Sequence, residues 1–356
     1  IRGFARLGLG TVEGPRAYIS GQYHTTDKWK GDGEQKTLMV NAKGVLPLGA
    51  VSLDAYASYS DRAEQDYQDL SLEMIGRLGY DWDNFGPSNY AKAIQVADIY
   101  NGSSNPKVYP EPITSVDDAY YDASGLRKDT IAALGLTAPL AEKLTVKLKG
   151  YYHENDGQGT WGTPYVNSPT GVPMSVRTTE YDLKRKGVFG SVAGQIADHD
   201  VTVGLWYENN KFNQARRFYA YASRTAPGRD HLKFMTDPFF TQWEFNFTTD
   251  TLQYYVQDKI SFGDATINLG WKGFKVKNQS DPVIAGGRAA GKIQSRDWFQ
   301  PHLGAAYKLN AKTEVFAGFT QATRAFTSST TSGPFSTTQA GFDAIKGTLK
   351  PEESDT

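Results

Sequence analysis

Apolar and polar side chains alternate along many segments of this chain. Between 51 and 60 the apolar positions are Val51, Leu53, Ala55, Ala57 and Tyr59. The same alternation recurs at 144–154, 251–259, 266–272 and 298–309. Because successive side chains of a β-strand point to opposite faces, each segment is predicted to be a strand with one apolar and one polar face.

Applied to the whole chain, this pattern predicts about twelve strands and an all-β fold. Most are about 10–12 residues long, which fits the ~9–11 residues that a tilted strand needs to cross a bilayer. The predicted strands are 4–12, 16–25, 36–46, 51–61, 130–139, 143–154, 187–196, 201–210, 251–262, 266–276, 297–309 and 313–324.

The connections between these strands alternate between short and long. Short ones lie at 13–15, 47–50, 140–142, 197–200, 263–265 and 310–312; long ones lie at 26–35, 62–129, 155–186, 211–250 and 277–296, with another opening at 325. In an up-and-down meander, alternate connections emerge at the same end of the sheet. One end therefore has tight turns and the other has large loops, which is typical of outer-membrane barrels with long extracellular loops.

The alternative is a soluble propeller or sandwich, whose strands average about 5–6 residues and whose connections are short at both ends. Strand length and loop asymmetry favour an antiparallel up-and-down transmembrane β-barrel. Its apolar faces would meet lipid, and its polar faces would enclose a lumen. Because backbone groups in hydrocarbon must all be paired, the sheet must close, so we expect further strands beyond those seen here.

This orientation predicts two sets of residues. Aromatic side chains on apolar faces near strand ends are candidates for the interfacial girdle, although cross-strand packing explains any single one equally well. These are Tyr59, Tyr152, Tyr207, Tyr254, Trp271, Tyr307 and Phe319. The side chains predicted to face the lumen are Lys147, Lys149, Tyr151, His153, Trp206 and His302.

Two segments of the chain carry distinctive residue patterns. The first is Tyr-Tyr-Val-Gln-Asp-Lys-Ile-Ser-Phe at 254–262, followed by a short turn and Ile-Asn-Leu-Gly at 267–270. The second is Phe-Thr-Gln-Ala-Thr-Arg-Ala-Phe at 319–326, followed by Leu-Lys-Pro-Glu-Glu-Ser at 349–354. Both segments resemble TonB-dependent outer-membrane receptors, the first a mid-barrel hairpin of that family. In that family, a strand ends in an Arg-Ala-containing stretch and the next loop closes in Leu-Lys-Pro-Glu-x-Ser, as in the second segment.

The resemblance implies a barrel of about 22 strands with a plug in its lumen, of which this chain would cover roughly the first half to two-thirds. All of 1–356 would then belong to one barrel domain, without the N-terminal plug, and the plug would pack on the lumenal side chains. The resemblance also implies uptake of a scarce nutrient, such as a ferric siderophore, with TonB binding a segment outside this chain.

The amino-acid composition excludes several classes of function. The 356 residues carry 38 basic and 39 acidic side chains, so the near-zero net charge gives no case for nucleic-acid binding. The chain has no cysteine, which excludes thiol chemistry and cysteine-ligated metals. Its five histidines are scattered and no serine stands in a nucleophile motif, so we expect neither an enzyme nor a cofactor.

The long connection 62–129 is acidic and rich in aromatic residues. Between 61 and 129 there are 13 acidic and 6 basic side chains and nine aromatic rings. Helices are predicted at 70–78, capped by Asp69, and at 89–100, capped by Ser88. The aromatic content indicates a folded extracellular structure, either a ligand lid or partner platform or a self-packed cap. A divalent ion could bind Asp117, Asp118 and Asp122, which lack calcium-loop spacing.

The connection 211–250 has the opposite charge. Between 211 and 233 there are six basic side chains against one aspartate, interleaved with aromatic rings. Arginine beside aromatic rings suits anionic or planar ligands; contact with lipid phosphates, or plain solvation, is the alternative. The candidate substrate-binding residues of the long connections are Arg216, Arg217, Tyr219, Tyr221, Arg224, Arg229, Tyr80, Trp82, Tyr90 and Trp161.

Three functions fit such a barrel. A plugged transporter of the bacterial outer membrane would import a nutrient, a passive porin-like channel would lack the plug, and an adhesion barrel would bind partners through its loops. The family resemblance and the charged, aromatic connections favour the transporter. Outer-membrane lipid or lipopolysaccharide would then surround it.

Overall fold

The computed structural model describes all of residues 1–356, which form one sheet of 13 strands. Each strand pairs antiparallel with its neighbours in sequence, so the predicted all-β up-and-down arrangement is confirmed. The strands are β1 Arg2–Gly10, β2 Arg16–Asp27, β3 Glu34–Leu48, β4 Val51–Gln65, β5 Tyr121–Ala141, β6 Leu144–Thr163, β7 Ser175–Ile196, β8 His199–Ala220, β9 Phe240–Phe262, β10 Ala265–Ile284, β11 Gly291–Asn310, β12 Thr313–Arg324 and β13 Glu352–Asp355.

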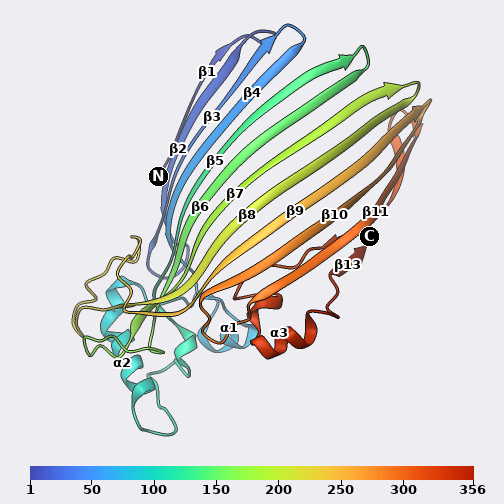
Figure 1. Ribbon diagram of the computed structural model, residues 1–356. Helices are drawn as coiled ribbons and strands as arrows, with labels where there is room; N and C mark the ends of the chain where they lie inside the picture. The colour runs from blue at the N-terminus through green and yellow to red at the C-terminus, as the bar shows by residue number, and fades with distance from the viewer.

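The tight turns lie at one end of the curved sheet, and the long connections lie with the helices at the other end (Figure 1). The helices are α1 Leu72–Leu78, α2 Tyr90–Asn101 and α3 Gln339–Ile345, with 3₁₀ turns at Pro87–Asn89, Val116–Asp118 and Pro334–Ser336. No helix combines the length and apolar composition needed to span a membrane.

The two faces of the sheet differ in the way that the alternation predicts. Leu148 and Leu205 are 49% and 53% exposed on the face that we call outward. On the opposite, inward face, the Trp206 indole donates to the Tyr151 hydroxyl over 2.9 Å, and Lys149 pairs with Asp54 at 2.8 Å. A contiguous exposed band of large apolar side chains is stable against lipid rather than water.

The central strands β5 to β11 are much longer than the predicted ones. β5 to β11 are each 20 to 23 residues long, about twice the ~9–11 residues of a bilayer crossing. The true connections there are 164–174, 221–239 and 285–290, so the predicted loops 155–186, 211–250 and 277–296 were too wide. Beyond the lipid band neither face is required to be apolar, so the alternation stops while backbone pairing continues.

Both helices predicted in the connection 62–129 are present, but their starts differ. Ser71 rather than Asp69 caps α1, with its Oγ accepting from the amide of Met74 over 3.1 Å. A 3₁₀ turn precedes α2, and the Ser88 hydroxyl donates to Asp32 over 3.2 Å instead of capping the helix.

Two buried clusters organise the loop end of the sheet. The larger joins α2 to the ends of β5, β7 and β8 and to the connection 221–239. The smaller, which we call the inner aromatic cluster, lies on the inward face and contains Trp243, Phe245 and Phe247 of β9 with Phe335 and Phe342 of the connection 325–351. The connection 325–351 therefore packs against the inward face of the sheet at its loop end, which we call the mouth.

Candidate functional site

An arginine on the inward face of β7 is surrounded by aromatic rings. Arg177 lies directly opposite Trp161 of β6. Its guanidinium carbon is 5.7 Å from the ring centre of Tyr120, 5.6 Å from that of Trp161 and 5.1 Å from that of Tyr165. Three electron-rich faces around one guanidinium hold it in place without neutralising its charge.

A second arginine lies beside this group on the same face. Arg216 of β8 stands over Trp243 at 5.3 Å and donates to the Thr179 hydroxyl over 3.3 Å. Burial, together with the charges of Arg177 and Arg288, lowers the pKa of Arg216 to about 10. Both Arg177 and Arg288 therefore act on the guanidinium group of Arg216, and we call these three residues the mouth arginines.

The mouth arginines have no carboxylate partner. None of the three takes part in an ion pair within the chain. The Nε atoms of Arg177 and Arg216 are buried without a hydrogen-bond partner, while Arg288 donates to the carbonyl of Ser336. Buried donors and clustered like charges are costly unless an acceptor binds them, so the group is suited to an anion.

The next residue along β8 shows the contrast. Arg217 points to the outward face and forms ion pairs with Glu180 at 2.5 Å and Glu244 at 2.9 Å. Its charge is already neutralised, whereas that of Arg216 is not. Two adjacent arginines therefore differ in chemistry because strand geometry sends them to opposite faces.

Of the ten predicted substrate-binding residues, Arg216 and Trp161 are the two that the structure places with the mouth arginines. Tyr219 and Tyr221 are buried in the larger cluster. Arg224 pairs with Asp98, and Arg229 pairs with Asp237. The remaining side chains lie in the connection 62–129: Tyr80 packs on Trp29, the Trp82 indole donates to the carbonyl of Asp118, and the Tyr90 hydroxyl donates to that of Ser223.

The predicted lumenal residues lie on the inward face. Besides Lys149, Tyr151 and Trp206, this face holds His153, which Asp129 and Arg185 contact at 3.1 and 2.8 Å. His302 contacts Thr320 at 2.8 Å, and Lys147 is exposed. The candidate girdle residues Tyr59, Tyr152, Tyr207, Trp271 and Tyr307 are exposed on the outward face.

The three aspartates considered for a divalent ion do not form a metal site. Asp118 binds Arg77, Asp117 accepts from Tyr120 and Tyr165, and Asp122 accepts from Gln65. No group of three or more histidine, aspartate or glutamate side chains is placed to hold a metal ion.

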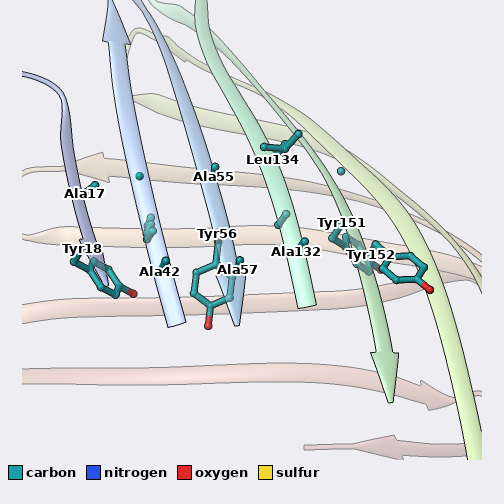
Figure 2. A pocket seen from close by; sticks show the side chains of 14 residues that line it. Ala17, Tyr18, Ala42, Ala55, Tyr56, Ala57, Ala132, Leu134, Tyr151 and Tyr152 are labelled. Atoms are coloured by element: carbon teal, nitrogen blue, oxygen red, sulfur yellow. The ribbon is translucent and has the colours of Figure 1, made fainter. Parts of the chain in front are cut away.

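A hollow of about 700 Å³ lies elsewhere, over strands β2 to β6. Figure 2 shows small alanine side chains such as Ala17, Ala55 and Ala132 beside the larger Tyr18 and Tyr56. Most of its lining residues belong to the outward face by register, within the lipid-facing band. It carries little polar chemistry and is distinct from the mouth arginines.

The sequence analysis missed Arg177 and Arg288. Both fell inside predicted loops, where no face could be assigned. The sequence gives no signal that groups them, and only the register of β7 against β8 shows that Arg177 and Arg216 share a face.

The fold is that of large outer-membrane receptors. The chain is similar to the unliganded ferric citrate transporter FecA, with 15% identity and a TM-score of 0.68, over 98% of this chain and 44% of that one. It is also similar to the siderophore receptor PiuA from Acinetobacter baumannii, with 12% identity and a TM-score of 0.65, over 99% of this chain and 51% of that one.

A third similar structure is the ferripyoverdine receptor of the outer membrane of Pseudomonas aeruginosa bound to ferripyoverdine. It is 14% identical with a TM-score of 0.62, over 99% of this chain and 43% of that one. The chain thus spans about half the length of these receptors or less. At such identities the likeness shows the fold alone, and no curated protein sequence matches the chain.

The sequence itself carries the family assignment. The pattern of the family described as TonB dependent receptor-like, beta-barrel matches residues 54–356, which is most of the chain. The family consists of transport receptors rather than enzymes, and its barrels lie in the bacterial outer membrane. The chain therefore belongs to the TonB-dependent receptor β-barrel family, as its strand pattern and its two characteristic segments predict.

Proposed function

We propose that this chain is part of a TonB-dependent receptor that binds a scarce anionic nutrient, such as a ferric siderophore, at its mouth and imports it. The observation that carries the proposal is the group of mouth arginines, which has no carboxylate partner on the inward face. The names of three similar structures, for ferric citrate, a siderophore and ferripyoverdine, agree with it.

The chemistry of the group favours a ligand with several oxyanions. Guanidinium groups bind carboxylates and other planar oxyanions through paired hydrogen bonds. The rings of Trp161, Tyr165 and Trp243 add apolar faces beside those donors. Ferric complexes of carboxylate or catecholate ligands combine negative charge with flat organic surfaces, so they match both features.

The remaining parts of the receptor are proposals of the same kind. Strands β1 and β13 are the unpaired edges of the sheet, so we propose that further strands close the barrel and that a plug occupies its lumen. TonB would bind a segment outside this chain. The connections 62–129 and 221–239 would lie outside the cell as a cap beside the mouth.

Uptake by cells tests this function directly. The full-length receptor would be expressed in a strain lacking its own siderophore receptors, and growth on a panel of ferric siderophores would be measured under iron limitation. We expect growth with at least one anionic siderophore, and loss of that growth when TonB is deleted. Growth that survives TonB deletion, with large ion conductance in planar bilayers, would instead indicate a passive channel.

A further inference from the structure

Four cations cluster on the outward face of β10 and β11, on the opposite side of the sheet from the mouth arginines. They are Lys275 and Lys277 of β10 and Lys292 and Arg296 of β11, which we call the basic patch. Lys275 lies directly opposite Arg296, and Lys292 lies opposite Gln279, two residues beyond Lys277. The inward neighbours Phe274, Val276 and Ile293 are buried, which fixes the basic patch on the other face.

No carboxylate forms an ion pair with the basic patch. None of its four cations forms an ion pair, and three of the four are exposed. Two carboxylates on the same outward face keep their negative charge, but each is held by a neutral amide instead of a cation of the basic patch. Asp250, opposite Lys277, accepts from Asn209 over 2.8 Å, and Asp281 accepts from Gln279 over 2.7 Å.

The position of the basic patch along the barrel axis indicates which part of the membrane it meets. The outward rings of Trp271 and Phe299 lie 6.1 Å apart, and Tyr254 stacks on Trp298 at 6.4 Å, which makes an aromatic belt on these strands. Lys275 follows Trp271 by four residues, or roughly 13 Å along the strand and about 10 Å along the membrane normal at a tilt of ~40°. This is the depth of lipid head groups beyond the hydrocarbon.

We propose that the basic patch binds a phosphorylated glycolipid of the outer leaflet, namely the lipid A part of lipopolysaccharide. Cations grouped within four residues along two adjacent strands match a head group with more than one phosphate. The apolar surface directly below, formed by Leu269, Trp271 and Leu303, is exposed and suits acyl chains. This site serves a structural lipid and is independent of nutrient uptake.

Lipid binding to the purified full-length receptor tests the proposal. After delipidation, the receptor would be titrated in detergent with bisphosphorylated lipid A, dephosphorylated lipid A, phosphatidylglycerol and inorganic phosphate, and binding followed by native mass spectrometry. We expect tight binding of bisphosphorylated lipid A only. Equal binding of dephosphorylated lipid A, or binding of inorganic phosphate without the lipid, would overturn the proposal.

Variants locate the site. Lys275→Gln with Lys277→Gln keeps side-chain length and is expected to weaken lipid A binding on the order of tenfold or more, since each basic side chain near an anionic surface contributes severalfold. The control is Lys308→Gln with Lys312→Gln, which removes two exposed lysines at the tight-turn end of β11. Equal affinity in both double variants would refute the site, and retained heat-modifiable migration on gels confirms that each barrel is folded.

Discussion

At the scale of single residues, the chemistry of the mouth depends on the face to which each arginine points. Arg216 and Arg217 are adjacent, yet one stands on Trp243 without a counter-ion and the other joins two glutamates. An unpaired buried guanidinium is available to a ligand, whereas a paired one holds strands together. We therefore propose that Arg216 serves ligand binding, whereas Arg217 stabilises the sheet.

Exchange of each arginine for glutamine separates these roles. Arg216→Gln is expected to weaken binding of an anionic ferric siderophore roughly ten- to hundredfold, because a charge-assisted hydrogen bond contributes about 1.5–3 kcal/mol. Arg217→Gln leaves Glu180 and Glu244 unneutralised, so it should lower thermal stability and leave affinity nearly unchanged. Fluorescence titration and thermal unfolding measure the two effects. Equal loss of affinity in both variants would contradict the assignment of the mouth arginines.

At the scale of elements, the connection 221–239 is held to the sheet by a buried histidine. His231 is 1% exposed, with Nδ1 3.0 Å from the Thr160 hydroxyl and Nε2 3.1 Å from that of Tyr221. The Ser124 hydroxyl donates to the His231 carbonyl over 2.5 Å. Burial lowers the pKa of His231 to about 4, because the charged imidazolium loses its hydration.

This pKa predicts a loss of local stability in acid. The open connection takes up a proton near the ordinary pKa of ~6.5, while the closed one resists until about pH 4. The contribution is therefore fully present above pH 6.5 and falls as the pH drops toward 4. When the pH is lowered from 7.5 to 5, protonation of His231 should raise the equilibrium constant for opening of 221–239 roughly 30-fold. Hydrogen exchange, corrected for intrinsic exchange rates, measures this constant.

His231→Gln is the matched control, because an amide keeps a donor and an acceptor but does not titrate. Asp122 acts in the opposite direction, since burial raises the pKa of its carboxyl to about 6. The contribution of Asp122 is the same in wild type and in His231→Gln, so it cancels when the opening constants of the two proteins are divided. If the ratio of opening between wild type and His231→Gln does not change with pH, the connection is held in some other way.

The sequence predicts elements well where lipid constrains them and poorly beyond. Val51, Leu53 and Tyr59 alternate with polar side chains because one face meets lipid, so β4 is recognisable. At 211–220 the outward face is covered by the connection 221–239 and the inward face lines the mouth. Apolar and polar side chains therefore do not alternate in this part of β8. The basic and aromatic composition of 211–233 identifies Arg216 as a binding candidate. Its position beside Arg177 follows only from the pairing register of β7 and β8.

At the scale of the whole molecule, the account depends on which face of the sheet meets lipid. Leu148 and Leu269 are exposed on the outward face, while their neighbours Lys147 and Asn268 point inward. With this orientation the mouth arginines lie inside the barrel and the basic patch lies against the membrane. The opposite orientation would exchange the two, so the functions proposed for both sites depend on this orientation.

Spin-label accessibility measures this orientation most directly. The chain has no cysteine, so single substitutions Leu148→Cys, Lys147→Cys, Leu269→Cys and Asn268→Cys can each carry a nitroxide label in full-length receptor freed of any other cysteine. In lipid vesicles, the labels at Leu148 and Leu269 should collide readily with oxygen and hardly with a water-soluble nickel chelate. The labels at Lys147 and Asn268 should lack that preference for oxygen. A preference for oxygen at Lys147 and Asn268 instead, or equal accessibility at all four positions, would contradict the account.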